Sequence, residues 1–85
     1  MNDLYLSTHA QQMLQERRIL EGWVWRTVDF PDSIELGDDD NMHYMKAIPE
    51  RNGRVLRVVI NETTEPNRIV TLFFDRRLTN TTRQK

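Results

Sequence analysis

Two residues near the start of the chain could act on a phosphate group. His9 and Arg17 lie in the stretch LSTHAQQMLQERRI and are eight positions apart, which places them on roughly the same face of one helix. In the first turn of a helix the free backbone N–H groups can hold an anion, and a neutral imidazole there can take a proton from a ribose hydroxyl. Arg17 would extend the phosphate contact, unless it pairs with Glu16 or Glu21. The alternative for His9 is packing beside Met13.

A second set of residues depends on a predicted β-hairpin. Asn52 and Gly53 both tolerate the positive φ of a type I′ turn, and they lie between two runs of alternating residues. A two-residue turn there places Lys46 opposite Val59. It also gathers four polar side chains on one face of the sheet, namely Tyr44, Lys46, Arg57 and Thr71.

Lys46 and Arg57 would then be two like charges close together on a half-exposed surface. Such charges cost stability unless an anion lies between them, and a phosphate matches the geometry of arginine. Tyr44 and Thr71 would add hydroxyl donors. The alternative is that the long side chains cover apolar neighbours while their charges meet solvent or Glu35.

Composition excludes several kinds of site. The chain contains no cysteine, so it has no disulfide, no thiol nucleophile and no cysteine-ligated zinc. His43 comes soon after the stretch GDDDN, but that stretch lacks the spacing of a calcium loop and a second histidine for a transition metal. We therefore expect a solvated turn over residues 37–41, with no metal and no cofactor. The predicted register places His43 opposite Glu62, at the rim of the core-facing side.

The charges are divided unevenly along the chain. The formal net charge of −1 argues against a dedicated nucleic-acid-binding protein. Residues 1–45, however, hold nine acidic and three basic residues, whereas residues 46–85 hold nine basic and four acidic ones. A basic face is therefore compatible with an almost neutral protein. The alternative is that the two halves attract one another across the fold or only solvate it.

Two helices and four strands would position these residues. Thr8 can cap a first helix over residues 9–18, with Gln11 completing a T-x-x-Q capping box. The stretch EGWVWRTVDFP predicts a second short helix, in which Trp23 and Trp25 cannot both face the core. Further along, the apolar period changes to two, which predicts strands over residues 33–36, 42–50, 55–62 and 68–75.

The fold class that follows is α+β. One or two short N-terminal helices pack on one face of a twisted four-stranded antiparallel sheet. The predicted core face of that sheet carries Met45, Ala47, Leu56, Val58, Ile60, Val70, Leu72 and Phe74. The 85 residues form a single domain, ordered from about residue 4 to 78, with a basic, polar and mobile tail over residues 79–85.

No part of the sequence indicates a membrane. No apolar run approaches the roughly 20 residues that span a bilayer. The start, MNDLYLSTH, lacks the basic region and the apolar core of a signal peptide. We therefore expect a cytoplasmic protein without a membrane partner.

The order of several short motifs resembles a family of small bacterial domains of unknown function. These motifs are STH, ERRI, WV, PDSIE, YMKAI, RVLRVVIN and IVTLFFDRR, and they span roughly residues 7–77. The resemblance groups the chain with the barnase, RelE and colicin-like ribonuclease superfamily, which includes RelE- and BrnT-type toxins. It implies a RelE-like fold, in agreement with the predicted elements.

The resemblance also implies a metal-independent endoribonuclease. In such enzymes a base activates the ribose 2′-hydroxyl, cations stabilise the phosphate and an acid protonates the leaving oxygen. Carried onto this sequence, the implied catalytic residues are His9, Lys46 and Arg57, and the implied substrate-binding residues are Arg17, Tyr44 and Thr71. The chain departs from related toxins in its net acidity and in lacking a histidine or tyrosine in the last strand and the tail.

Three classes of function follow from these observations. The first is the endoribonuclease, with RNA as substrate and an antitoxin protein as partner. The second is a non-catalytic module that keeps the nuclease-like fold and binds a protein or a nucleic acid. The third is a homodimer held together by a strand edge or by Trp25.

Overall fold

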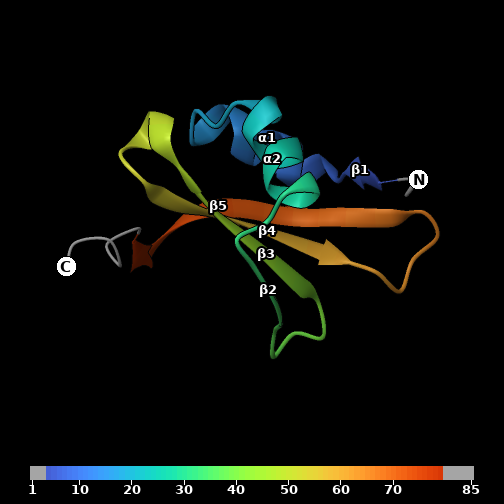
Figure 1. Cartoon of the computed structure of the whole chain (residues 1–85). Coiled ribbons are helices and arrows are strands. Elements are labelled where there is room, and N and C mark those ends of the chain that lie inside the picture. Colours follow the sequence, from blue (N-terminus) through green and yellow to red (C-terminus); the bar gives the residue numbers. More distant parts are fainter. Residues whose placement is uncertain (1–3, 80–85) are drawn as a thin grey trace.

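The structure is a computed structural model that describes residues 4–79. Its elements, in chain order, are β1 (Leu4–Leu6), α1 (Thr8–Glu16), α2 (Glu21–Asp29), β2 (Ser33–Leu36), β3 (Met42–Ile48), the 3₁₀-helix η1 (Pro49–Arg51), β4 (Arg54–Asn61) and β5 (Asn67–Thr79). The five strands form one sheet in the order β1, β5, β4, β3, β2, and both helices lie on the same side of it (Figure 1). We call this side the helix face and the opposite side the open face.

The prediction of a four-stranded antiparallel sheet is wrong, although the α+β class is right. β1 is a fifth strand that pairs in parallel with β5, with Leu6 opposite Ile69, so the sheet is mixed. The other three strand pairs are antiparallel. β1 has only three residues, which are too few to display an alternating pattern in the sequence. Its pairing is extended by the Ser7 N–H, which donates to the Ile69 carbonyl at 3.0 Å.

Ser7, rather than Thr8, caps α1. The Ser7 hydroxyl accepts a hydrogen bond from the Ala10 N–H at 3.0 Å and donates one to the Val70 carbonyl at 3.0 Å. The predicted cap, Thr8, is instead the first residue of the helix. The start of α1 is therefore fixed to β5 by one side chain.

α1 ends two residues earlier than predicted, at a left-handed turn. Arg18 has a φ of 55°. The next residue, Ile19, donates its N–H to the Leu14 carbonyl at 2.9 Å, which is how such a turn closes a helix. Ile19 is buried in the core, and Arg17 is left at the C-cap of α1.

α2 matches its prediction and packs on the sheet through one of its two tryptophans. Trp23, Val24 and Thr27 are buried, and the Thr27 hydroxyl donates to the Trp23 carbonyl at 2.8 Å. Trp25 is half-buried at the edge of the core, and its Nε1–H donates to Glu21 at 3.0 Å. The two tryptophans differ in burial, as their spacing predicted.

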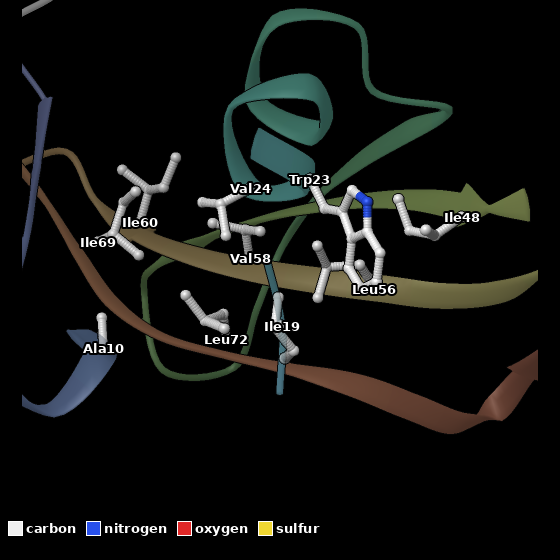
Figure 2. Packing of buried hydrophobic residues seen from close by; sticks show 10 residues of the cluster. All are labelled: Ala10, Ile19, Trp23, Val24, Ile48, Leu56, Val58, Ile60, Ile69 and Leu72. Carbon is white, nitrogen blue, oxygen red and sulfur yellow. The ribbon is translucent and has the colours of Figure 1, made fainter. Parts of the chain in front are cut away.

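The hydrophobic core lies between the helices and the helix face of the sheet (Figure 2). Its buried residues are Ala10, Ile19, Trp23, Val24, Ile48, Leu56, Val58, Ile60, Ile69 and Leu72. The predictions for Leu56, Val58, Ile60 and Leu72 are thus confirmed.

The hairpin between β3 and β4 has a longer connection than predicted. Pro49–Arg51 form η1, and Asn52 and Gly53 follow with φ values of 60° and 79°. The Gly53 N–H donates to the Ile48 carbonyl at 3.0 Å, and the strands meet at Ile48 and Arg54. Proline has a preset φ that suits the first residue of a helical turn, which favours η1 over a direct reversal. The positive φ values are confirmed, whereas the two-residue turn is wrong.

This longer connection shifts the register of β3 by three residues. Lys46 lies opposite Leu56, not Val59. An odd shift moves every side chain of a strand to the other face. Met45 and Ala47 therefore lie on the open face, and their predicted place on the core face is wrong.

Two further predictions concern the membrane and the end of the chain. Neither helix in the described part of the chain is long and apolar enough to cross a membrane. β5 extends to Thr79, one residue past the predicted ordered part. The rest of the predicted mobile tail, residues 80–85, lies outside the described residues.

Candidate functional site

The four polar side chains predicted to share one sheet face lie on two faces. Tyr44 and Lys46 are on the helix face, whereas Arg57 is on the open face. The shifted register of β3 is the cause. The predicted phosphate site between Lys46 and Arg57 is therefore not formed. Thr71 lies next to a register shift between β4 and β5, and its hydroxyl is beside His9 of α1.

Tyr44 and Lys46 are each engaged by a carboxylate of the same chain. The Lys46 ammonium lies 3.4 Å from Asp32 Oδ1, and the Tyr44 hydroxyl donates to Glu62 Oε2 at 3.0 Å. Burial, together with the hydrogen bond to Glu62 and its charge, raises the pKa of Tyr44. Both side chains are thus partnered within the fold.

His9 and Arg17 lie at opposite ends of α1. His9 is exposed in the first turn, and its Nε2 lies 3.1 Å from Thr71 Oγ1. Arg17 is the C-cap of the helix. It is eight residues after His9, and a rise of 1.5 Å per residue separates the two by about 12 Å along the helix axis. The two residues therefore have different surroundings.

Arg17 belongs to a pocket that the sequence did not predict. This pocket, which we call the arginine pocket, has a volume of about 150 Å³ and is lined by Arg17, Arg51, Arg54, Phe74 and Arg76. Its arginines come from the end of α1, from η1, from the start of β4 and from β5. The left-handed turn after α1 and the 3₁₀ turn before β4 thus contribute to one cationic site.

Arg51 is held by aromatic rings rather than by a carboxylate. Its guanidinium carbon lies 4.8 Å from the centroid of the Phe74 ring and 5.8 Å from that of the Trp23 ring, within the range of cation–π contacts. Its Nη1 also donates to the Arg18 carbonyl at 3.1 Å. These contacts orient the guanidinium group without neutralising it.

The arginine pocket has no counter-charge from the described part of the chain. Within residues 4–79 the basic residues that lie within 4.0 Å of a carboxylate oxygen are Arg26, His43, Lys46, Arg57 and Arg77, and none of these lines the pocket. Four like charges around one small cavity repel one another, and an anion that enters the cavity offsets that repulsion. The pocket is therefore suited to an anionic group.

Arg26 provides a contrast within the same fold. Its Nη1 and Nη2 each donate to a carboxylate oxygen of Glu50 at 3.0 Å. This hydrogen-bonded pairing raises the pKa of Arg26 and lowers the pKa of Glu50. Arg26 is an arginine with a satisfied partner, which makes it a natural control for those of the pocket.

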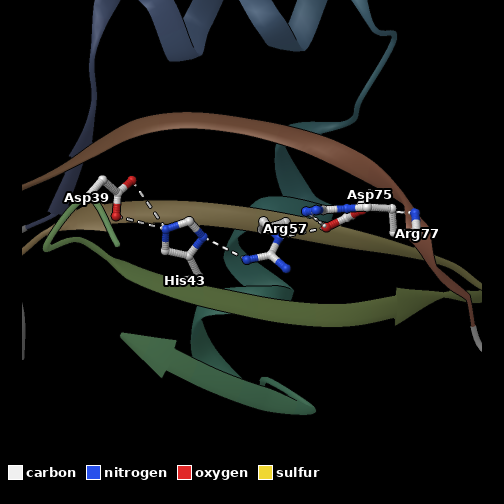
Figure 3. A network of polar contacts seen from close by, with 5 residues as sticks. All are labelled: Asp39, His43, Arg57, Asp75 and Arg77. Atoms are coloured by element: carbon white, nitrogen blue, oxygen red, sulfur yellow. Dashed lines mark hydrogen bonds and ion pairs between the residues drawn. The ribbon is translucent and has the colours of Figure 1, made fainter. Parts of the chain in front are cut away.

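A chain of polar contacts crosses the open face (Figure 3). Arg57 Nε donates to Asp75 Oδ2 at 3.0 Å, and Arg57 Nη1 donates to His43 Nδ1 at 2.8 Å. Because arginine has no acceptor, His43 Nδ1 must accept, and the ring proton of a neutral imidazole is then on Nε2. That nitrogen lies 3.1 Å from Asp39 Oδ1, to which it donates.

Asp75 is the buried charge of this network, with 4% of its surface exposed. It contacts Arg57 at 3.0 Å and Arg77 Nε at 3.3 Å. Burial alone would raise the pKa of Asp75, but hydrogen bonds from the Arg77 side chain and backbone, the Arg77 charge and the Arg57 hydrogen bond lower it below its ordinary value. The Arg57 guanidinium therefore offsets the buried charge of Asp75.

A cavity of about 400 Å³ lies beside the network. Glu35, His43 and Arg57 line it together with residues 36–39, so a glutamate, a histidine and an arginine border one space. The prediction that His43 lies opposite Glu62 on the core-facing side is wrong, because the shifted register places it on the open face. Across residues 4–79, no three or more histidine, aspartate or glutamate side chains are arranged to hold a metal ion.

Sequence reasoning missed Arg51, Arg54 and Arg76 as well as the joint position of Glu35 and His43. A signal for the arginines was present, because PERNGR places two of them around the hairpin turn and DRR places two in the last strand. The excess of basic residues after residue 45 indicated the same region. No comparable signal marks Glu35 and His43, whose proximity depends on strand register.

The fold and its sites define a small α+β domain with a cationic pocket. Residues 6–74 match the family model described as Domain of unknown function (DUF4258), and the chain belongs to this family. No curated protein and no solved structure matches the chain. Nothing in these comparisons links the family to the barnase and RelE superfamily that the motifs resemble.

Proposed function

We propose that this domain binds RNA by its phosphate backbone and that the arginine pocket is the anchoring site. The observation that carries the proposal is a small cavity lined by four arginines, none of which forms an ion pair with a carboxylate of residues 4–79. Guanidinium groups match phosphate oxygens in geometry as well as in charge. The net charge of −1 is compatible with this function because the basic residues are concentrated in one half of the chain.

The size of the pocket fits a phosphate group rather than a whole nucleotide. Its volume is about 150 Å³. Sites for drug-sized molecules are larger, at roughly 300–1,000 Å³. A phosphate of a longer chain would occupy the pocket while its sugar and base remain outside.

Recognition at this pocket concerns the backbone rather than the bases. Phe74 and Trp23 are the aromatic rings nearby, but the Arg51 guanidinium lies over both. These ring faces are therefore not open to stack on a base. Phosphate contacts position a nucleic acid without reading its sequence, so RNAs of different sequence should bind with similar affinity.

Salt-dependent binding tests this proposal. The anisotropy of a labelled single-stranded RNA, measured at several KCl concentrations, gives the slope of log affinity against log salt. Arg54→Ala and Arg76→Ala should each reduce that slope by about 0.7. Arg26→Ala, which removes an arginine already paired with Glu50, should leave it unchanged. Absence of wild-type binding at about 50 mM KCl, or equal slopes for all four proteins, would reject the proposal.

A second candidate function is a metal-independent endoribonuclease of the RelE and BrnT toxin type. The observation that favours it is the cavity shared by Glu35, His43 and Arg57. Glu35 would accept the proton of the 2′-hydroxyl as that oxygen bonds to phosphorus, and Arg57 would stabilise the phosphate charge. Glu35 would return the proton to the 5′-oxygen as its bond to phosphorus breaks, which leaves a 2′,3′-cyclic phosphate, and the Nε2–H of neutral His43 would donate a hydrogen bond to the phosphate. Of the three catalytic residues predicted from the sequence, this mechanism uses Arg57 and does not use His9 or Lys46.

Incubation of mixed RNA with the purified protein in EDTA tests the second candidate. Wild-type protein should give fragments with cyclic phosphate ends, and Glu35→Gln should slow cleavage by about a hundredfold or more. Glu35 is exposed on β2, so this substitution should not disturb the fold. A toxin of this type would also arrest growth when expressed, and an antitoxin protein would relieve the arrest. RNA that stays intact with wild-type protein would remove this candidate and leave the RNA-binding function.

A further inference from the structure

We propose that the outer edge of β2 binds an extended strand of a partner protein, one in which apolar and basic side chains alternate. β2 is an edge strand of the sheet and, in the described part of the chain, pairs only with β3. All four of its residues are exposed. Its outer backbone N–H and C=O groups can therefore accept a further strand. Figure 1 shows β2 at the margin of the sheet, on the side away from β1.

Exposed apolar side chains accompany this edge. Phe30, Ile34 and Leu36 expose 71%, 47% and 68% of their surface. Ile34 and Leu36 point to the same face of the strand because they are two positions apart, and Phe30 closes the C-terminal end of α2 just before β2. Apolar groups gathered along an unpaired strand edge are typical of a surface that another strand covers.

The charge of the same segment selects the kind of partner. Residues 29–40 contain six acidic residues and no basic one. Two of them, Asp32 and Asp39, contact Lys46 and His43 of this chain. Glu35 lies in the middle of β2 on the face opposite Ile34. A partner strand with lysine or arginine on one side and apolar residues on the other would therefore complement both faces of the edge.

A second copy of this chain is not the expected occupant. Antiparallel pairing of two β2 strands would bring two copies of the acidic segment 29–40 together and would place Glu35 close to its counterpart. Like charges in cross-strand positions are destabilising. The acidic residues thus oppose self-pairing, which is a common protection of strand edges, while they attract a basic strand. This reasoning disfavours the strand-edge homodimer at β2.

The edge is independent of the arginine pocket, because the two share no residue. The inference therefore goes beyond RNA binding, and either proposal can fail while the other holds. A four-residue edge makes only a small contact, so weak and rapidly exchanging binding is expected.

An NMR titration with a defined peptide tests the inference. The probe is an eight-residue peptide of alternating lysine and valine, and its control alternates glutamate and valine. The lysine peptide should shift the backbone amides of residues 33–36 and protect them from hydrogen exchange, whereas the glutamate peptide should not. Glu35→Lys should weaken binding about fivefold, because an attractive cross-strand charge pair becomes repulsive. Phe30→Ser should weaken it as well.

The matched control is Leu20→Ser. Leu20 is 60% exposed but lies at the other end of α2, so its replacement should leave peptide binding unchanged. Shifts centred outside residues 33–36, equal binding of the two peptides, or unchanged affinity in both Glu35→Lys and Phe30→Ser would overturn the proposal. A dimer of the free protein that Phe30→Ser dissociates would assign the edge to a second copy and would also overturn it.

Discussion

Removing the carboxylate of Asp75 should destabilise the protein more than removing an exposed charge. Asp75→Asn leaves Arg57, whose side chain is 13% exposed, without its carboxylate partner. Breaking a buried ion pair in this way costs about 3–5 kcal/mol. We expect the lower end, about 3 kcal/mol, because Arg57 keeps its hydrogen bond to His43 at 2.8 Å. Small domains have unfolding free energies of about 5–15 kcal/mol, so this loss is a large fraction of the total.

Urea unfolding followed by tryptophan fluorescence measures this change, because Trp23 is buried in the folded state. The midpoint should fall while the m-value stays constant. The control is Arg77→Ala, which removes the other partner of Asp75. The Arg77 side chain is 83% exposed, so its loss should cost less than about 1 kcal/mol. A loss below about 1 kcal/mol for Asp75→Asn would refute the view that this pair is a buried structural contact.

The remaining predictions concern the same carboxylate and the two ends of α1. The contacts with Arg77 and Arg57 outweigh burial and lower the pKa of Asp75 in the folded state. The Asp75 carboxylate therefore stabilises the fold above its unfolded pKa of about 3.9, and this stabilisation is lost as the pH falls through the folded pKa. The stability difference between wild type and Asp75→Asn should therefore shrink below about pH 4 in urea titrations, and a difference that grows there would contradict the assignment. Arg18→Gly should raise stability by about 0.5–1 kcal/mol in thermal unfolding, because a φ of 55° suits glycine; a lower melting temperature would show that the Arg18 side chain stabilises the fold. Ser7→Ala should cost about 1–2 kcal/mol, since one hydroxyl serves both Ala10 and Val70, and an unchanged midpoint would refute the cap.

Elements with a strong local pattern were predictable from the sequence. The spacing of Trp23, Val24 and Thr27 gives α2, and the alternation in SIEL gives β2 with its observed bounds. β1 was missed because three residues carry no period and its partner, β5, is more than 60 positions away in the chain. Local periodicity therefore predicted these elements, whereas a strand defined only by its distant partner left no pattern to detect.

Of the arginine pocket, the sequence predicted only the part that depends on a single helix. Arg17 was expected to contact phosphate, and it is the one predicted site residue that lines the arginine pocket. Arg54 and Arg76 join it through the pairing of β4 with β5, and that pairing cannot be read from either strand alone. The misplacement of Lys46 has a single physical origin, which is the 3₁₀ turn that begins at Pro49 and lengthens the hairpin.

The most direct measurement of the central claim follows the side-chain Nε–H signals of the arginines by NMR while a short single-stranded RNA is added. The account predicts that the signals of the pocket move, namely those of Arg17, Arg51, Arg54 and Arg76. The signal of Arg26, which is paired with Glu50, should stay in place. Movement of the Arg26 or Arg57 signal while the pocket signals remain fixed would contradict the account.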